Sequence, residues 1–284
     1  MTTREIIAAF ERGAHANRHD PHRVGNLIHL AAPGQVIMTG DLHGHVVNFE
    51  RIVRYADLEN RPARHLILHE ILHGGPTGLP DQCQSYLLLA RAAELKVRFP
   101  DQVHFLLSNH EIAQAVRSEV LKSGQPMVRA VNNAISAAFA DKSALVQKAM
   151  EDFIISMPLA IRTENRIWLS HSLPSARHLE YFEQPQFFDK TLTIDDLASD
   201  PGVHALTWDR VHSHHALERL GGLFHADVFI IGHKPQATGY GTEGDSLIVL
   251  ASDHPHGCFL PFTLDRNYSR DALLALIQPL ASLS

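Results

Sequence analysis

Short apolar runs that end in polar loops alternate with helical patterns along this chain, and this alternation limits the folds open to it. Residues 35–40 precede a helical pattern at 46–58, and residues 64–70 precede another at 81–99. A third run, 102–108, leads directly into a further helical pattern. Strands that alternate with helices indicate βαβ units and a largely parallel sheet, whose ligand crevice lies beyond the carboxyl ends of the strands. We therefore expect an α/β protein with its site at those ends.

The second half of the chain predicts further strands, from apolar runs at 158–163, 166–171, 227–233, 246–252 and 257–264. The first two of these runs are separated by Glu164 and Asn165, which predicts a hairpin. Ser269 is a helix-capping residue type and opens a predicted terminal helix over 269–280. The Ala-rich segment 112–152 has a helical pattern without recognisable chemistry. We expect it to be a helical cap inserted into a single domain that spans residues 1–284.

Composition excludes several classes of partner. The formal net charge of −6 provides no basic field, so we expect no extended nucleic-acid binding, whereas a small phosphorylated substrate remains compatible. No apolar segment reaches the length of a membrane span, and Thr2 with Glu5 forms a capping-box pattern in place of a signal peptide. The two cysteines, Cys83 and Cys258, are far apart and indicate a reducing compartment. We therefore expect a cytoplasmic protein without membrane contact.

Polar side chains of metal-ligand type follow five of the predicted strands. They are Asp41, His43, Glu70, Asn109, His110, His171 and His233. This set offers oxygen and imidazole ligands without a thiolate, which suits Mn, Fe or Zn at a catalytic site with open positions. A closed structural zinc site would have a different composition. Because the five strand ends should lie at one edge of the sheets, the sequence predicts a catalytic metal centre there.

Four motifs carry a resemblance to a known superfamily. GDLHGH, SNHEI, IWLSHSLP and IIGHKP resemble, in the same order, the GDxHG, GNHE, VHGGLP and GHT blocks of the calcineurin-like metallophosphoesterases, in the Ser/Thr phosphoprotein-phosphatase branch. The resemblance covers roughly residues 35–260. It implies an α/β fold of two mixed β-sheets sandwiched between helices, in four layers. GHKP lacks the second His of GHxH members, which favours the phosphatase branch over nuclease and phosphodiesterase branches.

The resemblance also implies a set of site residues and a cofactor. Two divalent metal ions are expected, most readily Mn, with Fe or Zn as alternatives. Their implied ligands are Asp41 and His43 for the first ion, Asn109, His171 and His233 for the second, and Glu70 as the bridge. His110 would be the general acid. Arg210, in the Trp208-Asp209-Arg210 element, would bind phosphate through the fork of its guanidinium group.

The second block departs from the family pattern GDxVDRG. Glu70 stands in place of the bridging Asp, His73 in place of the Asp that orients the acid, and Gly74 in place of a phosphate-binding Arg. A carboxylate can span ions about 3.5 to 4 Å apart, as two-metal catalysis requires. An imidazole bridge would hold the ions farther apart, so His69 is not expected to bridge. We expect the loop to draw back around the longer Glu70, which would let His73 reach phosphate or His110.

Three functions follow from the sequence. The first is hydrolysis of phosphate monoesters, such as phosphoserine or phosphothreonine, by attack of a metal-bridging hydroxide, with a phosphoprotein or a small phosphoester as substrate. The second is hydrolysis of dinucleoside polyphosphates or other small nucleotides, which relatives of this branch perform. The third is a regulatory role for a metal-binding protein whose altered second block has impaired catalysis.

Overall fold

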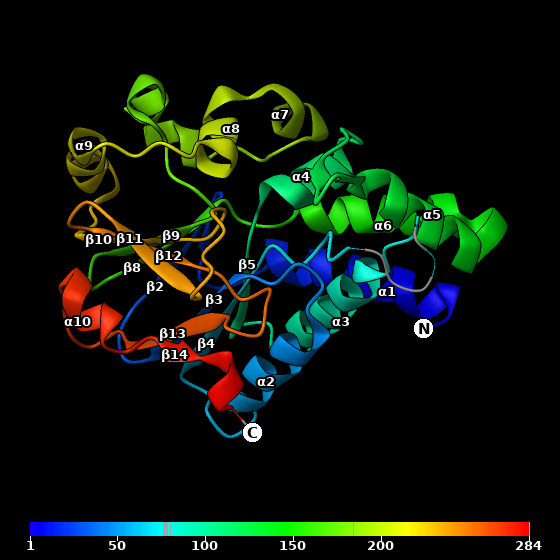
Figure 1. Cartoon of the computed structure of the whole chain (residues 1–284), viewed down its shortest axis with the longest axis horizontal. Helices are drawn as coiled ribbons and strands as arrows, with labels where there is room; N and C mark the ends of the chain where they lie inside the picture. The colour runs from blue at the N-terminus through cyan, green and yellow to red at the C-terminus, as the bar shows by residue number, and fades with distance from the viewer. Residues whose placement is uncertain (76–78, 80, 184, 284) are drawn as a thin grey trace.

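Two β-sheets lie face to face, with helices on their outer sides (Figure 1). The computed structural model describes residues 1–75, 79, 81–183 and 185–283. In order across the first sheet, the described strands are β14 (Gln278–Pro279), β13 (Cys258–Thr263), β3 (Gln35–Asp41), β4 (Arg64–His69) and β5 (Val103–Leu106). In order across the second sheet, they are β1 (Arg23–Val24), β2 (Leu27–Leu30), β8 (Ala160–Thr163), β9 (Ile167–Ser170), β10 (Val228–Ile231), β12 (Leu247–Leu250) and β11 (Tyr240–Glu243). A separate hairpin pairs β6 (Leu121–Lys122) with β7 (Gln125–Pro126).

Alternating residues of the central strands face two different apolar cores. In β3, Val36 and Met38 belong to the core between the sheets, while Ile37 belongs to the core that includes the helices. Ile230 and Phe229 of β10 divide in the same way. Side chains on a strand alternate between its two faces, so strands buried on both faces read as continuous apolar runs. This explains why the sequence shows unbroken runs at these strands.

Helices cover the outer faces of both sheets. They are α1 (Thr3–Arg18), α2 (Val46–Ala56), α3 (Ser85–Arg98), α4 (Asn109–Ala115), α5 (Met127–Phe139), α6 (Ser143–Ile155), α7 (Ile194–Ser199), α8 (Pro201–Trp208) and α9 (His214–Phe224). A further helix, α10 (Arg270–Leu274), packs through Leu273 against the core between the sheets. Four 3₁₀ helices are also described: η1 (Ala140–Lys142), η2 (Ala176–Phe182), η3 (Pro185–Phe188) and η4 (Leu280–Ser282). Helices α7, α8 and α9 gather on one side of the sheets and α1, α3, α5 and α6 on another (Figure 1). Trp168 of β9 stacks on Phe224 of α9 with ring centroids 4.0 Å apart.

The structure confirms the predicted α/β fold class and the pair of mixed sheets between helices. The capping box at Thr2 and Glu5 is also confirmed. Segment 112–152 forms most of α4, the β6–β7 hairpin, α5 and most of α6, and α6 packs against α1. That this segment caps a substrate stays a prediction.

The predicted terminal helix over 269–280 is wrong in its second half. Helix α10 begins after its N-cap Ser269 and ends at Leu274. Gln278 and Pro279 then pair with Phe259 and Cys258 of β13. Proline cannot donate the backbone hydrogen bond that a helix interior needs, whereas it is tolerated on an edge strand. Pairing with β13 therefore replaces the last turns of the helix.

No helix among the described residues has both the length and the apolar character needed to cross a membrane.

Candidate metal centre

The polar strand ends meet where the two sheets come together. Asp41 ends β3, and an isolated parallel bridge pairs it with Ala251, which follows β12 in the other sheet. A Cβ on Gly40 would lie 2.2 Å from the carbonyl oxygen of Leu250. Because no side chain fits at that distance, the glycine is what allows the sheets to approach here. The approach brings the ends of β3, β4 and β5 close to those of β9 and β10.

A second glycine holds Asp41 in place. A Cβ on Gly232 would lie 2.1 Å from Asp41 Oδ1, so this position also excludes a side chain. The backbone N–H of His233, the next residue, donates to Asp41 Oδ1 at 3.1 Å and to Oδ2 at 2.9 Å. The close glycine and the two contacts aim the carboxylate of Asp41 at the imidazoles around it.

The side chains expected at the second metal position lie together. Asn109 Oδ1 is 2.6 Å from His171 Nε2 and 3.0 Å from His233 Nδ1. His171 Nε2 is also 3.5 Å from Glu70 Oε1. These four residues come from the ends of β5, β9, β10 and β4. The structure thus brings two imidazole nitrogens, an amide oxygen and a carboxylate oxygen to one point.

The other oxygen of Glu70 faces the first metal position. His43 Nε2 lies 3.2 Å from Glu70 Oε2, while its Nδ1 faces the carbonyl oxygen of Leu72 at 3.0 Å. The carbonyl oxygen can only accept, so it holds the proton of neutral His43 on Nδ1 and leaves Nε2 free as a ligand. Ligand atoms of His43, Glu70 and His110 all lie within 4.8 Å of one another.

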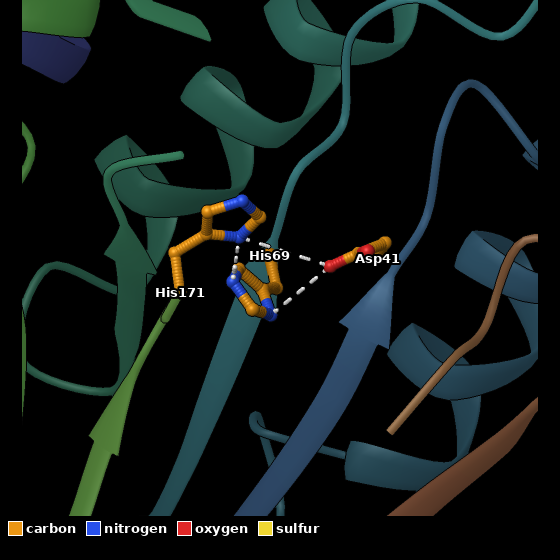
Figure 2. Close-up of side chains that lie close together, drawn as sticks. All are labelled: Asp41, His69 and His171. Carbon is orange, nitrogen blue, oxygen red and sulfur yellow. Dashed lines mark hydrogen bonds and ion pairs between the residues drawn. The ribbon is translucent and has the colours of Figure 1, made fainter. Parts of the chain in front are cut away.

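His69 also lies in this centre, although its imidazole is not expected to bridge two metal ions. Figure 2 shows its ring between Asp41 and His171, and ligand atoms of the three residues lie within 4.8 Å of one another. His69 is fully buried at the carboxyl end of β4. The signal that singled out the other candidates, a ligand-type residue at a strand end, was therefore present at His69 as well.

The electrostatics of the centre call for cations. Burial raises the pKa of Asp41 well above its usual range, and neighbouring Glu70 adds to the effect. Burial, followed by repulsion from Glu111, raises the pKa of Glu70 to about 7. Burial also lowers the pKa of His69 to about 3, with His233 and His43 adding to it. Among the described residues, the two buried carboxylates form ion pairs with histidines and with no Lys or Arg, so the donor set fits divalent cations.

Backbone strain is concentrated in the same place. His43, Glu70, His73 and His233 have φ angles of 41°, 35°, 63° and 65°. Non-glycine residues rarely adopt positive φ, and such conformations cost about 1–3 kcal/mol each where the surroundings hold them. Four strained residues in one cluster indicate that side-chain placement here is selected at the expense of stability.

The predicted acid, His110, has a histidine as its orienting partner. His110 Nδ1 lies 2.8 Å from His73 Nδ1, and His73 Nε2 lies 3.0 Å from Gln114 Oε1. Gln114 Nε2 donates to Asn132 Oδ1 at 2.9 Å, which leaves Gln114 Oε1 as the acceptor. Neutral His73 therefore carries its proton on Nε2, and its bare Nδ1 accepts from His110. The expectation that His73 could reach His110 agrees with this geometry.

The side chain of Glu111 fixes the loop that carries the altered second block. Its Oε1 accepts from the backbone N–H groups of Ile71 at 2.8 Å and Leu72 at 2.9 Å. At Gly74, where the family has a phosphate-binding Arg, a Cβ would lie 2.5 Å from the carbonyl oxygen of His43. This backbone therefore has no room for an arginine at that position.

Arg210 lies beside the centre and is exposed to solvent. Its Nη1 donates to the carbonyl oxygen of His233 at 2.8 Å. Arg177, Asp209 and Arg210 line part of a pocket of about 380 Å³. The guanidinium group is thus tethered next to the predicted second metal position, with its remaining donors available to a ligand.

The topology and the paired sheets define the calcineurin-like metallophosphoesterase fold, and the chain has this fold. It superposes on a protein serine/threonine phosphatase from Saccharomyces cerevisiae with similarity to human phosphatase PP5, with a TM-score of 0.67 and 13% identity over 99% of this chain and 94% of that one. A cold-active protein-tyrosine phosphatase of a psychrophilic Shewanella superposes with a TM-score of 0.57 and 13% identity, over 89% and 80% of the two chains. No protein-family model and no curated protein matches the sequence.

Proposed function

We propose that this protein is a metal-dependent hydrolase of phosphate monoesters. The observation that carries the proposal is the convergence of two buried carboxylates, Asp41 and Glu70, with imidazoles from both sheets, without a Lys or Arg ion pair to either carboxylate among the described residues. Such a donor set is suited to divalent cations. Without them, the buried carboxylates destabilise the folded protein. The fold shared with solved phosphatases supports the same proposal.

Two ions would be held by two overlapping sets of ligands. The proposed ligands are Asp41, His43 and Glu70 for the first ion and Glu70, Asn109, His171 and His233 for the second. Glu70 is proposed as the shared ligand because Oε2 faces His43 and Oε1 faces His171. When bound, the ions would polarise the phosphoryl oxygens and supply an activated water as nucleophile. Manganese is the proposed metal, with iron or zinc as alternatives.

The remaining side chains would bind the substrate and move a proton. Arg210 is proposed to hold phosphate oxygens through the N–H donors that its contact with His233 leaves free. The contact with His73 uses His110 Nδ1, so Nε2 is the atom from which His110 would protonate the leaving oxygen. Burial, with His43 and His73 adding to it, lowers the pKa of His110, so the ring is neutral in the free protein and would take up the second proton, on Nε2, only against the negative charge of a bound phosphate.

The proposed substrate is a phosphorylated serine or threonine side chain or a small phosphate monoester. The net charge of −6 disfavours an extended polyanion as substrate. Gly74 also replaces the phosphate-binding arginine of the family's second block, so the proposed site has one fewer cationic group for a polyphosphate. The superposed yeast protein is a serine/threonine phosphatase, which supports the choice of substrate, whereas the Shewanella protein is a tyrosine phosphatase. Both are phosphoprotein phosphatases, so we place a phosphoprotein first.

The experiment compares substrates on the metal-loaded protein. Hydrolysis of an aryl phosphate and of a phosphoserine peptide with added Mn²⁺ is expected, with loss of turnover when a chelator removes the ion. Asp41→Asn, prepared in parallel, controls for a contaminating phosphatase. Faster turnover of a dinucleoside tetraphosphate would favour the nucleotide hydrolase instead. Metal binding without turnover of any of these substrates would favour the regulatory role.

A further inference from the structure

His69 stands where the family motif GDxVDRG has its first glycine. The side chain is fully buried and contacts side chains from both sheets. Its Nε2 lies 2.8 Å from His171 Nδ1. Its Nδ1 faces Asp41 Oδ1 at 3.6 Å and has no hydrogen-bond partner among the described residues (Figure 2). A polar atom buried in this way is uncommon and calls for an explanation.

The positions of the protons follow from these contacts. One of the two ring nitrogens that face each other, His69 Nε2 or His171 Nδ1, must donate and the other must accept. If His69 donated, its bare Nδ1 would face the carboxylate oxygen of Asp41, and two lone pairs would repel. If His171 donates, His69 carries its own proton on Nδ1 and directs it at Asp41. The second arrangement is attractive at both contacts of His69. It leaves His171 Nε2 bare towards Asn109 Oδ1, 2.6 Å away, a pair of acceptors that a bound divalent cation would satisfy.

This second arrangement also leaves His171 Nε2 without a proton. That nitrogen is the one that converges with Asn109 Oδ1 and Glu70 Oε1. We infer that His69 is a positioning residue that transmits the orientation set by Asp41 to His171, so that His171 presents its free Nε2 to the second metal ion. The inference rests on the proposed function. Partners of this kind behind a metal-bound histidine typically change metal affinity or activity about 10- to 100-fold when removed.

The two ring nitrogens of His69 have different roles in this inference: Nε2 faces His171 and Nδ1 faces Asp41. Substitution by Gln or Asn replaces one of the two nitrogens at a time. Gln at position 69 places an acceptor near the position of the imidazole Nε2 and can still receive the proton of His171 Nδ1. Asn is shorter and places its amide near the position of Nδ1, beside Asp41, out of reach of His171. His69→Gln is therefore expected to keep the orientation of His171, and His69→Asn to lose it.

The measurement is a titration of each metal-free variant with Mn²⁺, in which stoichiometry and the two affinities are determined by calorimetry and elemental analysis. Wild type and His69→Gln are expected to bind two ions with similar affinities. His69→Asn and His69→Gly are expected to bind the first ion normally and the second about 10- to 100-fold more weakly. His65→Gln is the matched control, because His65 is a buried histidine of the same strand that contacts His104.

Three results would overturn the inference. Equal second-ion affinity in all variants would mean that His69 only fills space. A loss of the first ion in every variant would make His69 a direct ligand beside Asp41. A wild-type protein that binds no ion would overturn both this inference and the proposed function, whereas the first two results leave the proposed function standing.

An independent measurement keeps the test valid if a variant folds poorly. The imidazole ¹⁵N shifts of the Zn²⁺-loaded, ¹⁵N-histidine-labelled protein at mildly alkaline pH report which ring nitrogen of His171 carries the proton, and the spectrum of His171→Asn identifies its signals. The loaded protein is used because, without a metal ion, the contact of His171 Nε2 with Asn109 Oδ1 favours a proton on Nε2. Wild type is expected to show His171 protonated at Nδ1. Protonation at Nε2 in the wild-type protein would contradict the inference.

Discussion

Strand β4 carries a buried histidine near its first residue and another at its last, and the two belong to clusters with opposite electrostatics. His65 contacts His104, whose Nδ1 lies 2.9 Å from Asp20 Oδ2, and the ammonium group of fully buried Lys96 lies 2.5 Å from the same oxygen. Burial alone would raise the pKa of Asp20, but His104 and Lys96 outweigh it and hold that pKa well below its usual range. At the other end, His69 adjoins Asp41, whose pKa is raised.

The difference lies in where the compensating charge comes from. The Asp20 cluster contains its own cation, Lys96, which also donates to the carbonyl oxygen of Pro100 at 2.6 Å. The metal centre pairs its carboxylates only with histidines among the described residues. Similar residue types thus form a self-contained structural network in one place and the proposed cation-binding centre in the other. Burial and histidine content alone do not distinguish the two clusters. A lysine that forms a direct ion pair with the carboxylate does, because Lys122 acts on Glu70 only from a distance.

The largest expected effect is the loss of the metal centre itself. Asp41→Asn and His233→Ala should each lower turnover and metal affinity by more than about 100-fold. This exceeds the roughly 10- to 100-fold effect expected for residues that only contact a metal ligand. The fold should persist, because both residues lie at strand ends. Metal content and circular dichroism check this expectation, and Asp20→Asn should retain its metal. Full metal occupancy and full rate in either site variant would contradict the ligand assignment.

A second prediction compares the removal of one buried charged group from each of the two clusters in the metal-free protein. Lys96→Met leaves Asp20 buried without its cation and should lower the free energy of unfolding by about 3–5 kcal/mol. Asp41→Asn removes a buried carboxylate that has no cation and should leave the stability unchanged or raise it. Urea denaturation of both variants after chelation provides the measurement. Equal destabilisation by the two changes would remove the proposed contrast.

A third prediction concerns the proton that His110 supplies. His110→Asn should slow hydrolysis of an alkyl phosphate by at least about 10²-fold, and hydrolysis of a nitrophenyl phosphate by much less, because nitrophenolate leaves without protonation. His104→Asn, in the Asp20 cluster, should leave the ratio of the two hydrolysis rates unchanged. Steady-state kinetics on the two substrates decides the matter. If His110→Asn slowed both reactions equally, His110 would not be the acid.

A smaller effect is expected at the shared ligand. Glu70→Asp shortens the side chain by one methylene, and a displacement of about 1 Å can cost up to about 10²-fold in rate. We expect lower turnover and weaker metal binding, because the surrounding loop is fitted to Glu and is held by Glu111. His73→Ala tests the same loop through its contact with His110. A markedly faster Glu70→Asp enzyme would mark the native centre as degenerate and favour the regulatory role.

The smallest effect is a slope of stability against pH in the metal-free protein. The pKa of Glu70 rises from 4.5 to about 7 on folding, so its side chain binds more protons in the folded state between these values, and its contribution to stability falls as the pH rises through this interval. The depressed pKa of Asp20 has the opposite sign: its contribution is present above the unfolded pKa and is lost as the pH falls through the folded one. Buried histidines with lowered pKa values, such as His69 and His73, make stability rise with pH below about 6.5, so the denaturation midpoint of Glu70→Gln should rise more steeply with pH between about 4.5 and 7 than that of the wild type. An unchanged slope would contradict the assignment.

Much of the fold and most of the candidate centre could be predicted from the local sequence. Apolar runs that end in Asp41, Glu70 or His233 mark strand ends, and parallel strands bring their carboxyl ends to one edge. Thr2 and Ser269 mark helix starts because their side chains satisfy free backbone N–H groups. These features depend on neighbours within a few residues, which the chain order contains.

Other features depend on contacts between distant segments, and only the tertiary structure decided them. His65 and His69 occupy similar positions in one apolar run, yet His65 contacts His104, the partner of Asp20, and His69 faces Asp41, because each meets a different partner across the fold. Pairing of Gln278 with Phe259 likewise overrode a helical pattern. Local pattern determines which residues are buried and where strands end. Which buried groups meet, and whether a cation is among them, is set by the packing of two sheets.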